Sequence, residues 1–407
     1  MGEKILIIDD DPALLELAGK YLEKVGFETH LLQDSSLALD KMETLKPHVV
    51  FIDLMMPKVD GFHLIKEIRE RKEFSETKII VISAKSFEFD KDRAYEMGAQ
   101  YFIKKPLEYK KLHEIVNRVI KDELKVTFWG TRGTLAKPGP DTLKYGGNTS
   151  CVSLEFTKDR LFIFDAGTGV TELGKYLISH NRRQKMNLFI THPHWDHING
   201  FPFFMPVYQH GNEMVVYGSS HGNISLREVI GGQMESIYFP VTIKEFASRV
   251  YFKEIMEGEY DVEGISLKAI MLNHPGITLG YRATNSSGKS VAYITDNEII
   301  PDDIEKNKNY LRNKLVAFLK GVDILIHDSS YFDDEYRKRV GWGHPAISEV
   351  LRLAEAAEVK NLYLSHHDPD HDDAKVAEKE AFGRRYFEKR KLDIGCFSAI
   401  EGNSVVL

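Results

Sequence analysis

Short apolar runs alternate with amphipathic stretches through the first 120 residues, and this alternation restricts the fold more than any other feature of the chain. The runs 5–8, 49–52 and 79–82 contain only apolar side chains, which is typical of strands buried on both faces of a parallel sheet. The stretches between them have helical spacing, and the first begins at a capping Asp11 followed by Pro12. The alternation predicts a doubly wound α/β domain.

Polar side chains follow the predicted strands at the points where they end. Asp9 and Asp10 follow the first run, and Asp53 follows the run 49–52. Because the carboxyl ends of the strands meet at one edge of such a sheet, these carboxylates are expected to converge and to need a cation between them. Oxygen ligands with open positions suit Mg²⁺. Ser83 and Lys105 end later strands, where they would contact a phosphoryl group on one carboxylate.

This segment resembles the response-regulator receiver family over about residues 1–122. The resemblance implies that Asp53 accepts a phosphoryl group from a sensor histidine kinase and that Phe102 is the switch aromatic residue. The Mg²⁺ and phosphoryl contacts that it implies are Asp9, Asp10, the Met55 carbonyl, Ser83 and Lys105. The alternative is a degenerate receiver kept only for docking, and the filled chemical positions argue against it.

A helical pattern over residues 107–124 leads directly into a strand pattern over 125–129. No linker rich in Gly, Ser or Pro separates them, which favours packed domains over loosely tethered ones. We therefore predict two domains, 1–122 and 123–407, with the boundary near residue 123.

The second part of the chain mixes short apolar runs with helical stretches over about 280 residues, which suits one large α+β domain. The chain has 16 histidines but only two cysteines, Cys151 and Cys396. So few cysteines suit a reducing compartment and exclude a cysteine-based metal cluster.

The densest group of metal-binding side chain types is the segment 191–197, Thr-His-Pro-His-Trp-Asp-His, directly after the apolar run 188–190. On a loop that opens a helix, these side chains can diverge to serve two metals. Imidazole and carboxylate ligands suit Zn²⁺, Mn²⁺ or Fe. A solvated loop with surplus histidines is the alternative. Further candidate ligands also follow apolar runs, namely His274, Asp296 and His366.

This constellation is similar to the metallo-β-lactamase superfamily over essentially all of residues 125–407, which implies a four-layer αββα sandwich. The resemblance implies two metals and seven ligands: His192, His194 and His274 for the first metal, Asp196, His197 and His366 for the second, and Asp296 bridging them. A two-metal site activates water and stabilises charge during a displacement, so Asp196 counts among the catalytic residues. Asp165 matches an aspartate that supports a ligand or its loop.

The ligand pattern also bears on the branch of the superfamily. His194 stands where the redox di-iron branch commonly has Glu, which favours hydrolysis over electron transfer. The order His274, Asp296, His366 resembles the phosphodiesterase branch. His344 matches a histidine that contacts the scissile phosphate or acts as general acid in that branch. A histidine that merely starts a helix is the alternative for His344.

Other residues have weaker signals. Arg132 could pair with a substrate phosphate, because guanidinium matches phosphate geometry, and an ordinary surface salt bridge is the alternative. The polar run 367–373 is expected to be a solvated turn. Asp328 is a candidate support for a ligand, and His327 is left without a role.

The function predicted from these residues is a phosphorylation-regulated two-metal hydrolase that acts on a small phosphodiester such as a cyclic nucleotide. Two alternatives stay open: a lactonase or thioesterase of the same fold, and a non-enzymatic metal-based signalling module. The substrate, the metals and the sign of regulation are not determined by the sequence. Phosphorylation could relieve occlusion of the metal edge, or it could drive receiver dimerisation and so form a homodimer.

The net charge and the lengths of the apolar runs argue against nucleic acid and membranes as partners. The net charge is −7, and the region 201–265 has no basic arm, so we expect no nucleic-acid partner. Every apolar run is far shorter than the roughly 20 residues that span a bilayer. We therefore expect a cytoplasmic protein without membrane insertion.

Overall fold

The chain forms two compact units, each with its own core, in the computed structural model. The first comprises residues 1–123 with 156–159, and the second comprises residues 124–155 with 160–407. The structure describes residues 2–84, 88–157, 160–179, 185–301, 304 and 309–407. Among these described residues, no helix is both long enough and apolar enough to cross a membrane.

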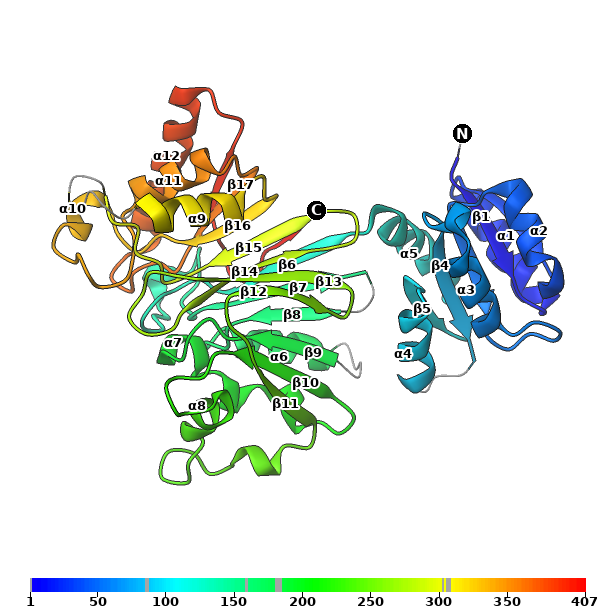
Figure 1. Cartoon of the computed structure of the whole chain (residues 1–407), viewed down its shortest axis with the longest axis horizontal. Helices are drawn as coiled ribbons and strands as arrows, with labels where there is room; N and C mark the ends of the chain where they lie inside the picture. The colour runs from blue at the N-terminus through cyan, green and yellow to red at the C-terminus, as the bar shows by residue number, and fades with distance from the viewer. Residues whose placement is uncertain (1, 85–87, 158–159, 180–184, 302–303, 305–308) are drawn as a thin grey trace. The chain divides into compact units, whose positions relative to one another are not determined.

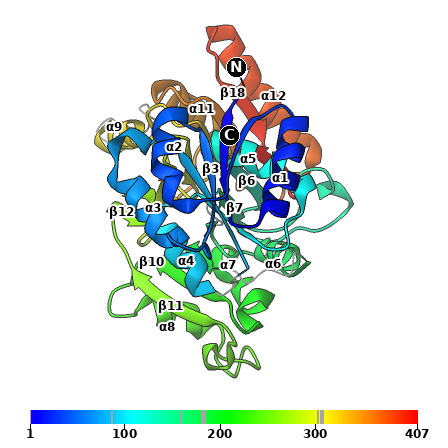
Figure 2. The ribbon, with the colours of Figure 1, turned by 90° about the vertical axis from the view of Figure 1, so that its right-hand side faces the viewer.

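The first unit contains a parallel five-stranded sheet with the order β2-β1-β3-β4-β5. Its strands are β1 (Lys4–Ile8), β2 (Glu28–Leu32), β3 (Val49–Asp53), β4 (Lys78–Ser83) and β5 (Tyr101–Lys104). One face is covered by α1 (Pro12–Lys24) and α5 (Tyr109–Lys121), and the other by α2 (Ala38–Leu45), α3 (Gly61–Glu70) and α4 (Glu88–Glu96) (Figure 2). The predicted doubly wound α/β fold is confirmed.

The apolar runs in this sheet are continuous because both faces are buried. Along β1, Ile5 and Ile7 pack into the core under α1 and α5, whereas Leu6 and Ile8 pack into the core on the opposite face. Side chains alternate between the two faces of a strand, so neither face tolerates a polar residue before the strand ends. The first polar side chains therefore appear at the carboxyl edge.

The second unit contains two seven-stranded sheets. One has the order β11 (Arg249–Glu254), β10 (Glu213–Gly218), β9 (Lys185–Phe189), β8 (Leu161–Phe164), β7 (Cys151–Phe156), β6 (Leu124–Gly130) and β19 (Ser404–Val406). The other has the order β12 (Gly258–Val262), β13 (Ile265–Met271), β14 (Leu279–Thr284), β15 (Ser290–Ile294), β16 (Ile324–Asp328), β17 (Asn361–Ser365) and β18 (Gly395–Ser398). Strand β19 pairs antiparallel with β6.

Helices cover the outer face of each sheet (Figure 1). The first sheet packs against α6 (Val170–Ser179) and α8 (Leu226–Gly232), and the second against α9 (Asn309–Leu319), α11 (Ile347–Ala356) and α12 (Asp373–Arg390). Two short helices, α7 (Trp195–Ile198) and α10 (Asp333–Tyr336), follow β9 and β16. The described 3-10 helices are η1 (Ser35–Leu37), η2 (Lys72–Phe74), η3 (Pro140–Thr142), η4 (Phe201–Phe203), η5 (Met205–Tyr208) and η6 (Ile243–Glu245). The predicted four-layer αββα sandwich is confirmed.

Aromatic rings fill the space between the two sheets. Phe164 of β8 stacks on Tyr281 of β14 and on Tyr293 of β15, with ring centroids 5.7 and 5.4 Å apart. Phe189 of β9 lies 5.6 Å from Tyr281. Each such pair contributes about 0.5–1.5 kcal/mol beyond the area that it buries. These contacts fix the two sheets face to face, so that strands of both sheets end at a shared edge.

Candidate functional site

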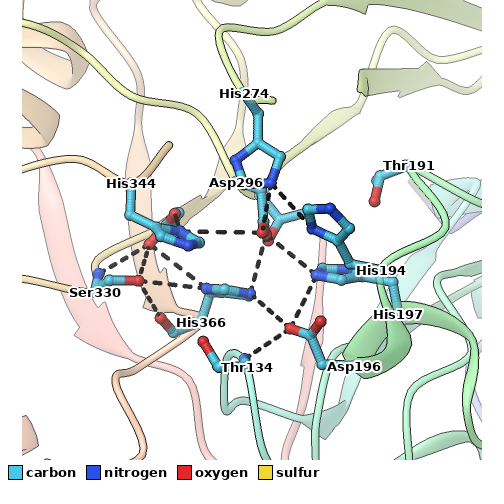
Figure 3. A network of polar contacts seen from close by, with 12 residues as sticks. Thr134, Thr191, His194, Asp196, His197, His274, Asp296, Ser330, His344 and His366 are labelled. Carbon is cyan, nitrogen blue, oxygen red and sulfur yellow. Dashed lines mark hydrogen bonds and ion pairs between the residues drawn. The ribbon is translucent and has the colours of Figure 1, made fainter. Parts of the chain in front are cut away.

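Loops after strands of both sheets bring histidines and aspartates together at one edge of the second unit (Figure 3). The contributing strands are β9, β13, β15 and β17. Donor atoms of His192, His194, His274 and Asp296 lie within 4.8 Å of one another, and so do those of Asp196, His197 and His366. The structure therefore brings together all seven residues named as ligands from the sequence.

Asp296 lies between the two groups and faces both. Its Oδ2 atom lies 3.6 Å from Nε2 of His192 and 3.6 Å from Nε2 of His274. Its Oδ1 atom lies 3.2 Å from Nε2 of His197 and 3.0 Å from Nε2 of His366. Burial raises the pKa of Asp296, but the surrounding imidazoles outweigh burial and hold it well below its ordinary value. One carboxylate thus joins two sets of imidazoles, as a bridging ligand must.

Three residues of the site adopt left-handed backbone conformations at or just after strand ends. Asp165, Asp296 and His366 have φ values of 59°, 48° and 54°. Such conformations cost about 1–3 kcal/mol each and persist only where the surrounding structure holds them. Here they end the extended backbone so that polar side chains gather at the edge of the sheets.

Hydrogen bonds from the far ring nitrogens orient the imidazoles. His197 donates from Nδ1 to Asp165 at 2.7 Å, and the buried Asp165 also accepts from the Tyr293 hydroxyl at 3.1 Å. His274 donates from Nδ1 to the Gly343 carbonyl at 3.0 Å. Each bond turns Nε2 toward the cluster, where Nε2 of His274 lies 3.2 Å from Nδ1 of His194, and this is the usual arrangement around a metal-binding histidine.

Two loops approach the cluster closely because they carry glycine. A Cβ on Gly133 would lie 2.3 Å from the His366 ring, and a Cβ on Gly343 would lie 2.1 Å from Nδ1 of His274. Next to Gly133, the Thr134 N–H donates to Oδ2 of Asp196 at 2.7 Å. Thr134 has a φ of 62°, which is a strained conformation for a β-branched residue. The segment 131–134 resembles a part of the active-site rim in this superfamily, but the hydrogen bond from the Thr134 backbone was not predicted.

His344 lies beside the cluster and is held by Asp328. Its Nδ1 atom donates to Oδ2 of Asp328 at 2.8 Å, and the other oxygen of Asp328 accepts from the Ser330 hydroxyl at 2.7 Å. Burial lowers the pKa of His344, but the carboxylates of Asp328 and Asp296 outweigh burial and raise it above its ordinary value. Donor atoms of His344 and Asp328 also lie within 4.8 Å of those of Asp296 and His366. The carboxylate leaves Nε2 of His344 as its free ring nitrogen.

The residues fit divalent metals. Nε2 of His192 and Nε2 of His197 are buried without a hydrogen-bond partner, although each faces the cluster. Burial lowers the pKa of His192 and of His274 and so favours the neutral imidazole that binds metal. Five imidazoles and two carboxylates form a nitrogen and oxygen donor set of the kind that Zn²⁺, Mn²⁺ and Fe accept.

Arg132 differs from both sequence-based expectations. Its side chain is fully buried, and its guanidinium donates from Nε to the Gly146 carbonyl at 2.8 Å and from Nη1 to the His371 carbonyl. A surface salt bridge is therefore wrong, and a buried guanidinium that binds backbone carbonyls is not available to a substrate phosphate. The expected solvated turn at 367–373 is also wrong at His367 and His371, which are both buried because this loop pairs with the loop after β6.

A second group of carboxylates lies at the carboxyl edge of the five-stranded sheet. Donor atoms of Asp9, Asp10 and Asp53 lie within 4.8 Å of one another. Nζ of Lys105 lies 2.9 Å from Oδ2 of Asp9 and 2.9 Å from Oδ2 of Asp53. Burial raises the pKa of Asp9, whereas the hydrogen bond from Lys105 opposes that shift. An all-oxygen donor set at a strand edge fits Mg²⁺.

The remaining residues named for this edge lie close to it in the fold. The Met55 N–H donates to Oδ1 of Asp53 at 3.3 Å, and the Met55 side chain is exposed. Ser83 is buried at the end of β4, the neighbour of β3. Phe102 lies within β5, half-buried against the core under α2, α3 and α4.

Comparison with known families identifies both parts of the chain. The beta-lactamase superfamily domain matches residues 160–367, and the response regulator receiver domain matches residues 5–117. The chain therefore belongs to the beta-lactamase superfamily and carries a response regulator receiver domain ahead of the metallo-β-lactamase fold.

Individual relatives agree with this assignment. The alkaline phosphatase synthesis transcriptional regulatory protein PhoP of Bacillus subtilis (strain 168) is 33% identical over 121 residues, which are 30% of this chain and 50% of PhoP. This chain thus spans about half the length of such curated relatives. Protein PilG of Pseudomonas aeruginosa is 32% identical over 111 residues, which are 27% of this chain and 82% of PilG.

A solved structure also matches the second part. The crystal structure of the metallo-beta-lactamase fold protein YhfI from Bacillus subtilis aligns with a TM-score of 0.50 and 16% identity. The alignment covers 70% of this chain and 100% of YhfI. At this identity the likeness concerns the fold alone.

Proposed function

We propose that residues 123–407 form a two-metal hydrolase that cleaves small phosphodiesters such as cyclic nucleotides. We further propose that residues 1–122 control it through phosphorylation of Asp53. The observation that carries the proposal is the pair of His344 and Asp328, held beside the histidine and aspartate cluster with Nε2 of His344 free. Cleavage of a cyclic nucleotide requires both charge neutralisation at the phosphate and a proton for the leaving alkoxide, and the cluster and His344 together can supply them.

The cluster would hold two metals through the residues named above. His192, His194 and His274 would bind one metal, Asp196, His197 and His366 the other, and Asp296 both. When bound, the metals would activate water and neutralise charge on the phosphate. Asp165 would keep His197 in the tautomer whose Nε2 faces the cluster, and the Thr134 N–H would hold one oxygen of Asp196.

His344 would act as the general acid. Because its Nδ1–H is donated to Asp328, the proton on Nε2 is the one that can pass to the leaving oxygen. Asp328 would fix the ring orientation and stabilise the imidazolium. General acid catalysis typically contributes about 10²–10⁴-fold.

Leaving groups of different basicity test this role. We expect His344→Ala to lower kcat on a cyclic nucleotide by about 10²–10⁴-fold, because the leaving alkoxide needs a proton. The loss on bis-p-nitrophenyl phosphate should be much smaller, because p-nitrophenolate leaves without one. Bound metal, measured by mass spectrometry, should stay at the wild-type level. A parallel loss of metal would instead make His344 a ligand.

A substrate panel tests the proposed reaction class. Metal-reconstituted full-length protein should cleave bis-p-nitrophenyl phosphate and at least one cyclic nucleotide. Cleavage of lactones or thioesters with the phosphodiesters untouched would contradict the proposal and favour the rival hydrolases. A fully metallated protein without turnover on any ester would favour a metal-based signalling module.

The carboxylate edge of the receiver would hold Mg²⁺ and accept the phosphoryl group, with a sensor histidine kinase as its donor. Lys105 would pair with the phosphoryl oxygens in place of the carboxylates that it now contacts. Radiolabelled acetyl phosphate should label the wild type and the Asp40→Ala control, which removes an exposed carboxylate on α2. Asp53→Ala should take up no label, and equal labelling of all three proteins would refute the assignment.

Coupling between the two parts can be measured with beryllofluoride, which mimics the phosphoryl group. If phosphorylation relieves occlusion, turnover should rise at constant oligomer size. If it drives dimerisation, light scattering should report a homodimer. Identical rates and identical mass would argue against both routes.

A further inference from the structure

The metal loop carries a tryptophan that faces water. Trp195 stands between His194 and Asp196 in the chain, and its side chain is 80% exposed. The reason is local: α7 begins at this residue, and its next two side chains, Asp196 and His197, are buried in the cluster. Trp195 is thereby directed away from the core while staying one residue from two proposed ligands.

A second tryptophan stands on another loop that contacts the cluster. Trp342 is 60% exposed and lies between Gly341 and Gly343, both with positive φ values. The Gly343 carbonyl accepts from Nδ1 of His274, so this loop is fixed against a proposed ligand. The guanidinium of Arg339 lies 5.9 Å from the Trp342 ring. An aromatic face and a cation are therefore neighbours at this point.

A third loop shows the same arrangement. Leu135 follows Thr134, whose N–H donates to Asp196, and the Leu135 side chain is 62% exposed. Each of these three loops contributes a contact to the cluster and, within one residue of it, a large apolar side chain that water reaches. What the three side chains share is that each directly adjoins, in the chain, a residue that contacts the cluster or belongs to it.

The third tryptophan of the chain provides the contrast. Trp129 on β6 is only half-exposed, donates from Nε1 to the Ser153 hydroxyl at 2.8 Å and packs 5.4 Å from the Tyr176 ring. It behaves as an ordinary tryptophan, with its body packed and its polar atom paired. Of the three tryptophans, the two without such packing are those on the metal loops.

We infer that Trp195 and Trp342 form an aromatic rim that stacks on the heteroaromatic base of the substrate. This inference rests on the proposed phosphodiesterase function and narrows its substrate class to nucleotides. Flat π-faces suit a base, since every base has a face that can stack on an aromatic side chain. Arg339 adds a cation beside the rim, which suits an anionic nucleotide and would serve no purpose for the neutral acyl tail of a lactone.

Equilibrium binding to the full-length, metal-loaded protein tests the rim without requiring turnover. The probes are adenosine 5′-monophosphate and ribose 5-phosphate, which share a phosphate and a sugar but differ in the base. Calorimetry gives the affinities, and quenching of tryptophan fluorescence reports whether a base meets an indole. The variants are Trp195→Leu and Trp342→Leu, which keep apolar bulk but remove the π-face. Trp195→Phe restores a π-face, and Tyr310→Leu is a control at a 75% exposed aromatic residue on α9.

We expect adenosine 5′-monophosphate to bind more tightly than ribose 5-phosphate and to quench the fluorescence. Each Trp→Leu change should weaken its binding by about tenfold, in line with stacking on one aromatic side chain. Binding of ribose 5-phosphate should stay unchanged. Trp195→Phe should recover most of the affinity, and Tyr310→Leu should match the wild type.

Equal affinity for the two probes would refute the inference that Trp195 and Trp342 stack on the base. Unchanged affinity for adenosine 5′-monophosphate in both Trp→Leu variants would refute it as well. Tighter binding of a hexanoyl lactone that is lost in the same variants would also overturn it and assign the surface to an acyl chain. Failure of the proposed function has a separate outcome: base-dependent binding would persist, while the wild type cleaves no phosphodiester.

Discussion

Lys105 lies 2.9 Å from two carboxylates at the receiver edge, whereas Asp296 is surrounded by imidazoles. In the receiver, the chain itself supplies a positive charge, and the donor atoms for a cation are oxygens alone. In the domain with the metallo-β-lactamase fold, the donor atoms are imidazole nitrogens together with carboxylate oxygens, and outer hydrogen bonds hold the imidazoles of His197 and His274 in place. The first arrangement suits a Mg²⁺ ion that comes and goes with the phosphoryl group, and the second suits metals that stay bound.

The two units also differ in the pKa of a lysine, Lys105 in the first and Lys379 in the second. Burial lowers the pKa of Lys105, but its hydrogen bonds to Asp9 and Asp53 outweigh burial and raise it above the ordinary value. Burial lowers the pKa of Lys379 on α12 to about 7. Its ammonium donates to the uncharged backbone carbonyls of Ser329 and Ser330. One lysine is kept charged by its partners, while the other is held close to neutrality.

The largest expected effect comes from removing the carboxylate that joins the two sets of imidazoles. Asp296→Ala should lose bound metal and reduce phosphodiester turnover to background, because both sets lose their shared oxygen donor. Asp53→Ala should retain in full the metal expected at the cluster of the second domain, since it alters only the receiver edge. Metal content after dialysis into chelator-free buffer, measured by mass spectrometry, checks both variants. Full metal content in Asp296→Ala would contradict the view that this cluster, unlike the receiver edge, holds its metals through Asp296.

A smaller effect is expected from the carboxylate behind the cluster. Asp165→Asn should weaken metal affinity or activity by about 10–100-fold, the usual consequence of altering the partner of a metal-binding histidine. The amide no longer offers His197 a charged acceptor, so the ring is held less firmly. Metal titration with a competing chelator measures the change. Asp323→Asn, at a carboxylate bound to Lys360 and Ser290, is the matched control and should leave the affinity unchanged.

The smallest effect concerns the pH dependence of stability at Lys379. Its pKa in the folded protein lies below the ordinary value of 10.5, so between pH 7 and 10 the unfolded chain binds the extra proton and folding becomes more favourable as pH rises. Between pH 6 and 9, the wild type should gain about 3 kcal/mol relative to Lys379→Met. The charged groups around this ammonium are Glu335, Asp328, Asp368 and Arg132.

Denaturant unfolding followed by tryptophan fluorescence measures this difference in the correct domain, because Trp129, Trp195 and Trp342 all lie in residues 124–407. Lys389→Met, at an exposed lysine on the same helix, should follow the wild-type pH dependence. A constant difference between the wild type and Lys379→Met across this range would contradict a lowered pKa.

Local pattern was enough to predict much of the fold. The apolar runs at 151–156 and 161–164 coincide with β7 and β8, because period and burial are properties of the segment itself. The same logic placed Asp296 and His366 among the candidate ligands, since polar residues appear where buried strands end. The roles of Asp296 and His366 as metal ligands stay predictions until bound metal is measured. The domain boundary at residue 123 also stays a prediction until separate fragments on either side of it are shown to fold.

What could not be predicted depends on contacts between distant segments. Arg132 looked like a surface residue because nothing near it in sequence shows that the 367–373 loop covers it. Asp296 was expected between the two sets of imidazoles only through the family resemblance, because its position depends on how the two sheets face each other and not on the residues around it in the sequence. The exposure of Trp195 depends on the four-residue helix that turns its neighbours inward.

The pairing of β19 with β6 has a consequence for how the chain is made. The edge of β6 that pairs with β19 stays open during synthesis until the chain reaches Ser404, where β19 begins. Ser404 comes 300 residues after Lys104, the end of the last receiver strand. At roughly 5–20 residues per second, a ribosome needs about 15–60 s to cover that distance. During most of that interval, once α5 has been made, a receiver domain would be attached to a domain of the metallo-β-lactamase fold that is still being synthesised.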